Sequence, residues 1–184
     1  MDFPEVSYIA LNAPYEAGSV LWADLVINIP LSQDPTLGRK LSSTQKGYLE
    51  DRNAAYVEGV GGNNIIRNNR VASGEWISNI RGRDNMQVDV NAAYLNLLIS
   101  QRGTKIPYTD SGIARLQAVL RNVLERYVLR GFIKPNYKIR FLRESQMSVS
   151  DKKMGLYNGG SFQAELQGGI LFVDLNGTLA IELG

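Results

Sequence analysis

Two long segments with the apolar spacing of α-helices occupy the middle of the chain, between residues 83 and 131. In the second segment, 110–130, apolar residues recur at steps of three and four, which places them on one face of a helix. Thr109 is a suitable N-cap, and Gly131 follows the last periodic residue. The linker 101–108 separates the two helices. The predicted buried face of the second helix comprises Ile113, Leu116, Leu120, Val123, Leu124 and Tyr127.

The first helical segment, residues 83–100, is apolar on two roughly opposite sides. A helix that is apolar on two faces is expected to be buried on both. Two interpretations stay open: the helix lies between two layers of one domain, or one face packs on the domain's own core and the other meets a second subunit. The first stripe is Met86, Val90, Ala93 and Leu97, and the second is Val88, Ala92, Leu95 and Ile99.

Residues before this pair of helices give shorter signals. Apolar and β-branched residues over 20–29 predict a strand, and 43–53 predicts a short helix that is capped by Ser42 or Ser43. A further strand is expected over 54–60, followed by a turn at 61–64. We then expect a hairpin around Asn68-Asn69, with 65–67 and 70–72 as its two arms.

Alternating apolar and polar residues replace the helical period after Gly131. A half-buried strand is expected over 137–142, and a helical turn over 151–154. The last 23 residues predict a three-stranded antiparallel meander, because turn dipeptides separate three β-prone runs. Its parts are the strand 162–167, the turn Gly168-Gly169, the strand 170–175, the turn Asn176-Gly177 and the strand 178–183.

These elements together predict an α+β fold. Two long helices pack on a mixed or antiparallel sheet, and the chain ends in the C-terminal antiparallel β-meander. We expect residues 1–40 to form an N-terminal extension with the first strand, and residues 41–184 to form one α+β domain. The 184 residues are enough for one good hydrophobic core.

Composition excludes several classes of chemistry. The chain has no cysteine and no histidine, which removes thiol and imidazole nucleophiles, bases and metal ligands together. Its net charge of +2 provides no strong field for nucleic acids or anionic membranes. No apolar run reaches the roughly 20 residues of a membrane span. An enzyme could then use only carboxylate, lysine, tyrosine or serine side chains, and a hydrolase with paired carboxylates is the weakest alternative. Because the sequence brings no such pair together, we expect no enzymatic activity, with no catalytic, cofactor-binding or metal-binding residues.

Three local sequence patterns are candidate sites of phosphate, metal or nucleic-acid binding. The glycine-rich turn 59–62 follows a strand but no helix follows it, so a tight strand-to-strand turn is favoured over a phosphate loop. The acidic residues Asp84, Asp89 and Asp110 lack the spacing of a metal site. The arginines of helix 110–130 favour a solvated face, and a nucleic-acid-binding module is the alternative function. These arginines are Arg115, Arg121, Arg126 and Arg130.

Four runs of sequence, in this order, resemble contractile phage tail sheath proteins, specifically a sheath-like family of uncharacterised phage proteins. The similarity covers about residues 40–184. That family has a strand, a GE-aromatic-I entry into a long helix, a K-[IV]-PYTD-x-GI link, a second long helix and a closing meander. Residues 1–40 match it loosely, and the family's extended N-terminal arm is missing, so we expect a truncated or divergent short member. The four runs are 46–60, 72–84 (ASGEWISNIRGRD), 105–113 (KIPYTDSGI) and 169–178 (GILFVDLNGT).

The resemblance implies a structural subunit of a contractile tail sheath or a related injection particle. Such subunits stack in helical rings around an inner tube, are linked by arms that add strands to neighbouring sheets, and contract to drive the tube through the host envelope. The implied partners are further copies of the chain, the inner tail tube protein, and the baseplate and tail terminator proteins, without nucleic acid or a small-molecule substrate. The implied location is the virion tail, assembled in the cytoplasm of the bacterial host. The predicted self-assembly contacts are Val88, Leu95, Ile99, Thr178, Leu179 and Ile181.

Overall fold

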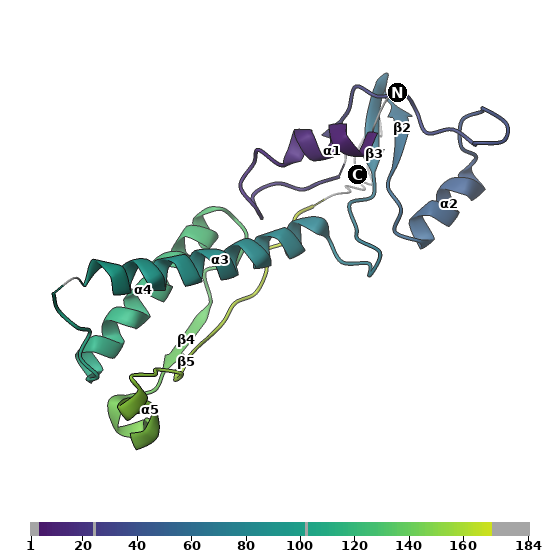
Figure 1. Cartoon of the computed structure of the whole chain (residues 1–184). Coiled ribbons are helices and arrows are strands. Elements are labelled where there is room, and N and C mark those ends of the chain that lie inside the picture. Colours follow the sequence, from purple (N-terminus) through teal and green to yellow (C-terminus); the bar gives the residue numbers. More distant parts are fainter. Residues whose placement is uncertain (1–3, 24, 102, 171–184) are drawn as a thin grey trace, which may run out of the picture.

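The protein is elongated and consists of two parts that meet near the start of its longest helix (Figure 1). The computed structural model describes residues 4–23, 25–101 and 103–170. We call residues 4–67 the N-terminal lobe and residues 77–170 the helical body. The lobe contains α1 (Pro4–Asn12), β1 (Leu25–Val26), α2 (Ser43–Asp51), β2 (Tyr56–Val60) and β3 (Asn63–Arg67). The body contains α3 (Ile77–Ser100), α4 (Asp110–Leu129), β4 (Lys138–Phe141), a 3-10 turn (Glu144–Gln146), α5 (Val149–Met154) and β5 (Gly160–Gln163).

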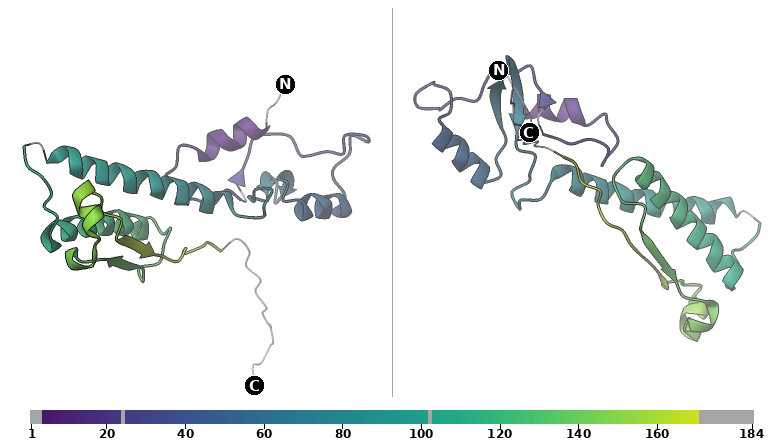
Figure 2. Two further views of the ribbon diagram at one scale, coloured as in Figure 1. Left: turned by 60° about the horizontal axis from the view of Figure 1, so that its bottom comes forward. Right: turned by 180° about the vertical axis from the view of Figure 1, so that it is seen from behind.

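The α+β class is confirmed, although the strands form two small antiparallel sheets. The lobe holds a three-stranded sheet in the order β1-β3-β2, and the body holds the pair β4-β5. Helix α4 packs on both α3 and β4, whereas the lobe's sheet lies beyond the start of α3 (Figure 2). The domain boundary that we expect at residue 40 stays a prediction.

Helix α4 forms the centre of the main core. Its side chains Leu124 and Tyr127 have no exposed surface, and Val123 is 1% exposed. They pack against Met86 of α3 and against Phe132, which follows α4 in sequence. The helix begins as predicted, because the Thr109 hydroxyl accepts a hydrogen bond from the Gly112 amide at 3.4 Å. The apolar period of this segment therefore identified both the helix and its buried face.

Helix α3 begins at Ile77, six residues before the expected start, and its first part carries a close helix–loop contact. Gly82 is buried against Phe132, and a Cβ atom on Gly82 would lie 2.2 Å from the Phe132 ring. The first apolar stripe packs as predicted, with Met86 buried and Val90 and Ala93 against the core. The interpretation that places α3 between two layers is wrong, because Val88, Leu95 and Ile99 remain exposed. The lobe's sheet lies off the end of the helix, and within residues 4–170, as far as they are described, no second layer covers this side of α3.

The first hairpin forms at the predicted strand-to-strand turn, whereas the hairpin predicted around Asn68-Asn69 does not form. Strands β2 and β3 pair with Val60 opposite Asn63, so Gly61-Gly62 makes the turn, and both glycines have positive φ angles of 58° and 85°. Such angles suit glycine, which has no Cβ atom. Asn68 ends β3, and the predicted second arm 70–72 makes only an isolated bridge from Arg70 to Trp76.

The predicted strand 20–29 shortens to β1, whose two residues pair with Ile65 and Ile66 of β3. The flanking side chains of Trp22, Ile27 and Ile29 are buried, so these apolar residues reach the core from irregular backbone. Helix α1 had no clear sequence signal. The predicted short helix is confirmed as α2, where Ser42 and Gln45 form a capping box. The predicted turn 151–154 is confirmed within α5.

The start of the predicted meander pairs with a different partner. Strand β5 lies antiparallel to β4, with Phe162 opposite Ile139. The predicted strand 170–175 lies outside the described residues from 171 on. Gly168-Gly169 makes no tight turn, and the Leu21 side chain lies close to Gly169. An apolar pair directly opposite on β4 and β5 favours this non-local pairing. The turn Asn176-Gly177 and the strand 178–183 lie outside the described residues.

The contact between Gly82 and Phe132 gives a stability prediction. Gly82→Ala should destabilise the fold by about 1–3 kcal/mol, because the added methyl group would overlap the Phe132 ring. Gly47→Ala in α2 is the matched control, since a Cβ atom there meets no atom within 4 Å and should instead stabilise the helix by up to about 1 kcal/mol. Urea denaturation compares the free energies of unfolding. A Gly82→Ala chain as stable as Gly47→Ala would contradict this packing.

Candidate assembly surfaces

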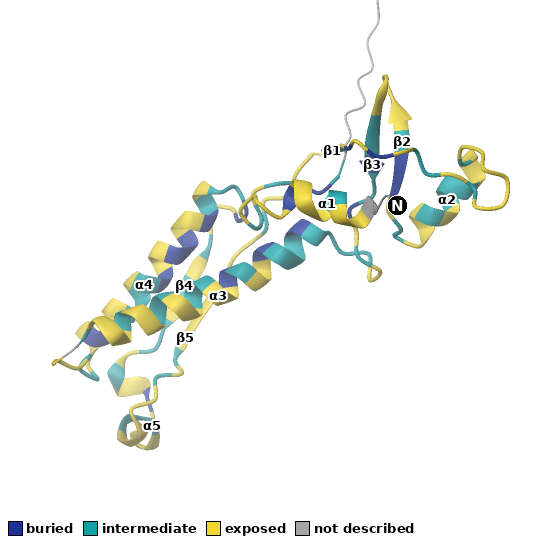
Figure 3. Ribbon diagram, turned by 45° about the horizontal axis from the view of Figure 1, so that its top comes forward, coloured by how far each residue is buried: buried dark blue, intermediate teal, exposed yellow. Residues whose placement is uncertain are grey.

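The predicted contacts on α3 lie together on one exposed face of the helix. Val88, Leu95 and Ile99 are 63%, 57% and 53% exposed, and Leu98 beside them is 60% exposed. Exposed positions recur along α3 and form a long accessible strip of the helix (Figure 3). We call this strip the outer face of α3, defined by the exposed residues Gln87, Val88, Asn91, Ala92, Leu95, Asn96, Leu98, Ile99 and Ser100.

The outer face of α3 carries no charge over its whole length. Asp89 is the one charged residue between Gln87 and Ser100. It points inward, where it accepts a hydrogen bond from the Tyr127 hydroxyl at 3.0 Å. Solvated helix faces normally carry charged side chains, and the centres of protein interfaces are depleted of them. The outer face therefore has the composition of a contact surface.

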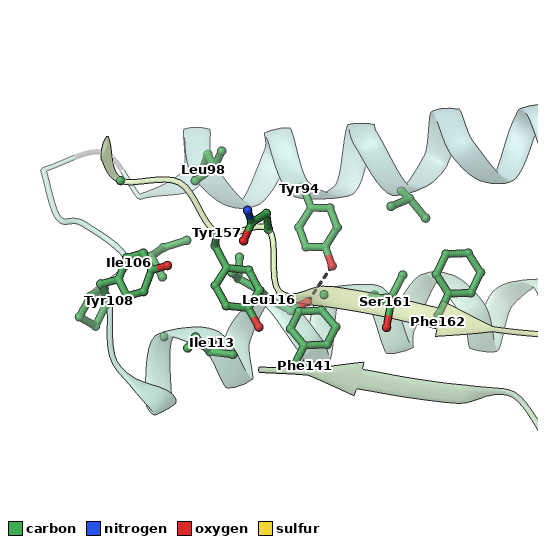
Figure 4. A pocket seen from close by; sticks show the side chains of 17 residues that line it. Tyr94, Leu98, Ile106, Tyr108, Ile113, Leu116, Phe141, Tyr157, Ser161 and Phe162 are labelled. Carbon is green, nitrogen blue, oxygen red and sulfur yellow. Dashed lines mark hydrogen bonds between the residues drawn. The ribbon is translucent and has the colours of Figure 1, made fainter. Parts of the chain in front are cut away.

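A groove runs between α3, α4 and β5 (Figure 4). A cavity of about 490 Å³ lies at its outer end, and its walls include Tyr94, Leu98, Phe141 and Phe162. A second cavity of about 550 Å³ shares Val90 and Phe162 with the first and continues along β5 to Leu166. Together they make one long, mostly apolar channel beside this strand.

Three tyrosine hydroxyls in the first cavity are already engaged with the backbone. Tyr94 donates to the Leu116 carbonyl at 3.3 Å, Tyr108 to Leu156 at 3.0 Å and Tyr157 to Leu142 at 2.8 Å. Burial raises the pKa of each hydroxyl, which keeps all three protonated as donors. Because these groups are satisfied, the cavity presents ring surfaces instead of reactive groups.

Strand β5 borders this groove with an open edge. It pairs with β4 on one side, and no other strand within the described ranges pairs with it. All four of its residues are exposed, including Phe162 at 40%. An open edge offers unpaired backbone amides and carbonyls to another strand. The predicted contacts Thr178, Leu179 and Ile181 lie outside the described residues.

The other sequence patterns do not converge into a site. Arg115, Arg121 and Arg126 are exposed on α4, whereas Arg130 is 20% exposed and contacts carboxylates. Among the described residues, no group of three or more acidic side chains could hold a metal ion. Within the same residues, no helix is both long and apolar enough to cross a membrane. The glycines of 59–62 form the end of β2 and the hairpin turn, as expected.

Sequence reasoning missed two exposed apolar features. Leu98 is exposed at the border between the outer face of α3 and the first cavity, and it was not among the predicted contacts although it lies three residues after Leu95. Helix α1 exposes Val6 and Ile9, which are 59% and 53% accessible and three residues apart. That spacing was the available signal for a helical face, although a nine-residue segment gives it little weight.

Comparisons with known proteins show the fold of the chain. No family model and no curated protein matches it. A chain in the cryo-EM structure of the anti-feeding prophage (AFP) baseplate, 6-fold symmetrised, matches with a TM-score of 0.65 at 14% sequence identity. The match covers 95% of this chain and 48% of that chain, so this chain spans about half the length of its structural neighbour. At this identity the likeness establishes a shared fold, and the α+β architecture described above is that fold.

Proposed function

We propose that the chain is a structural subunit of a contractile injection particle, and more specifically of a tail sheath. The observation that carries this proposal is the outer face of α3, which has no charge from Gln87 to Ser100 and exposes the large apolar side chains Val88, Leu95, Leu98 and Ile99. The fold shared with a chain of the anti-feeding prophage baseplate supports the same class of particle. In this proposal the chain acts by packing against copies of itself, without catalysis.

The outer face supports self-association on energetic grounds. Soluble monomers rarely expose contiguous apolar patches of more than a few hundred Å². Complete burial of a large aliphatic side chain contributes about 1.5–3 kcal/mol, so half-exposed Val88, Leu95, Leu98 and Ile99 each contribute roughly 1 kcal/mol. Association itself costs at least about 4 kcal/mol. One such contact is therefore weak, and stable assembly requires several contacts for each subunit.

The groove along β5 supplies a second contact of a different kind. The C-terminal residues Leu179 and Ile181 alternate with polar or small residues, which suits a strand with one apolar side. We infer that the segment 178–183 of a neighbouring copy adds to the open edge of β5, with Thr178 also in contact. Strand addition takes affinity from backbone hydrogen bonds and specificity from side-chain pockets, and the groove offers both.

The two contacts together favour an open, repeating assembly. A contact that joins different surfaces of two copies generates a ring or a helical filament, because it does not close on itself. The groove and the C-terminal segment are different surfaces of one chain, as this geometry requires. In a sheath, the remaining partners would be the inner tube, the baseplate and the tail terminator. Such a particle would assemble in the cytoplasm of the bacterial host and become the virion tail.

A substitution on the outer face tests the first contact. Leu95→Asp should raise the concentration needed for assembly at least about 30-fold, because an unpaired carboxylate would be buried at the contact. Leu129→Asp on α4 is the matched control, since Leu129 is more exposed, at 86%, but lies off the outer face. Sedimentation velocity over a concentration series gives the two midpoints. Equal midpoints for the two variants would remove the outer face from the assembly.

A peptide experiment tests the second contact. A fluorescent peptide of residues 170–184 should bind the full chain, and Phe162→Asp should weaken its binding at least about tenfold by placing a charge in the groove. Val60→Asp is the control, because Val60 ends a strand of the other sheet and is similarly exposed, at 43%. Fluorescence anisotropy measures both affinities. Loss of binding in both variants, or in neither, would contradict strand addition at β5.

A further inference from the structure

The N-terminal lobe meets the helical body at two places with different character. One is the covalent link, residues 68–76, which leads directly into α3. The other is residues 13–23, which we call the bridging loop; it leaves α1, passes the end of α4 and returns to β1 (Figures 1 and 2). Glu16 in this loop forms an ion pair with Arg130 of the body. The bridging loop thus fixes how the lobe is turned relative to the body.

Arg130 joins three segments of the chain. Its guanidinium holds the Glu16 carboxylate through two contacts, from Nε to Oε2 at 2.7 Å and from Nη2 to Oε1 at 3.1 Å. Its Nη1 atom lies 3.7 Å from Oδ2 of Asp89 in α3. The guanidinium also stacks over the Tyr127 ring, 5.0 Å from the ring centre. Arg130 therefore has one partner in the lobe and two in the body.

This arrangement allows Glu16 to leave without stranding a buried charge. The Arg130 side chain is 20% exposed, and it would keep Asp89 and Tyr127 as partners after Glu16 departs. The Glu16 side chain is already 61% exposed, so water replaces its lost contact. Breaking a buried ion pair is costly when one charge remains alone, and that cost is absent here. Exposed pairs of this kind contribute little and are screened by salt.

The surfaces beneath the bridging loop fit together incompletely. A cavity of about 380 Å³ lies between Gly18 to Leu21 of the loop and Asn79, Phe132 and Gly169 of the body. This cavity is partly open to solvent, so the loop buries less surface here than core elements do. The loop still makes close contacts with the body, because a Cβ atom on Gly18 would overlap the Phe132 ring and the Leu21 side chain lies close to Gly169. Trp22 of the loop also stacks with Arg81.

Polar groups near the covalent link are also left unsatisfied. Asn69 is fully buried, and neither polar atom of its side chain has a hydrogen-bond partner among the described residues. One terminal nitrogen of Arg81 is likewise buried and unpartnered in that set, while its guanidinium stacks on Trp22 at 4.7 Å. Each such group opposes the observed arrangement. A rotation of the lobe that admitted water would satisfy both.

We propose that the pair of Glu16 and Arg130 is a latch that holds the lobe in one orientation on the body. When the latch opens, the lobe turns about residues 68–76 while the packing of α3 on α4 remains intact. The latch lies within one chain and does not depend on assembly, so it goes beyond the proposed structural role. Each subunit would then have two orientations of its lobe. A cationic group that competes for Glu16, or salt that screens its charge, would favour the open orientation.

Double electron–electron resonance on the full chain tests the latch. The chain has no cysteine, so Leu37→Cys in the lobe and Val149→Cys in α5 label two exposed sites specifically. Labelled protein is diluted into unlabelled protein, so that only distances within one chain contribute. At low salt the parent should give one main distance, and Glu16→Gln should raise the population of a second distance about fivefold. Glu5→Gln, at an exposed position of α1, is the control and should match the parent.

The response to salt distinguishes opening of the latch from a general loss of stability of the fold. Sodium chloride at about 1 M should shift the parent toward the distribution of Glu16→Gln and should change Glu16→Gln much less. Circular dichroism should show the same helix content for all three chains, because α3 and α4 keep their contact. The latch is overturned if Glu16→Gln gives the parent's distribution, if Glu5→Gln shifts it equally, or if salt acts as strongly on Glu16→Gln as on the parent.

Discussion

The packing of α4 against α3 around Tyr127 determines where the other parts of the molecule lie. The Tyr127 ring is fully buried, and its hydroxyl group contacts Asn85 and Asp89 of α3 at 2.6 and 3.0 Å. This contact turns one side of α3 toward α4 and leaves the opposite side outward. It also positions Phe132 against Gly82 and directs the chain into β4. Both candidate contact surfaces follow from this single helix–helix interface.

A helix that is apolar on two sides needs a partner on each. Among the described residues α4 is the helix that packs along α3, and the sheet of the N-terminal lobe lies beyond the start of α3. The cost of exposing Leu95 and its neighbours is therefore not recovered by the described part of the chain. A second copy of the protein would recover it, which is the physical basis of the proposed assembly.

The sequence predicted best those elements whose signal is local. Helix α4 has one apolar face, a capping threonine and a terminal glycine, and all three appear in the structure. The turn at Gly61-Gly62 was predicted, whereas the hairpin predicted around Asn68-Asn69 does not form, because a pair of residues that suits a turn does not decide whether the flanking segments pair. The pairing of β5 with β4 depends on contact between Phe162 and Ile139, 23 positions apart, which periodicity does not reveal. The exposed stripe of α3 was identified correctly as apolar, but its surroundings depend on the whole fold.

Negative-stain electron microscopy of the purified full chain, over a range of protein concentration and salt, tests self-assembly most directly. Self-assembly predicts rings or tubes that form above a threshold concentration and persist in high salt, because the contacts are apolar and uncharged. Single particles of monomer size under every condition, together with a monomeric mass in solution, would contradict it.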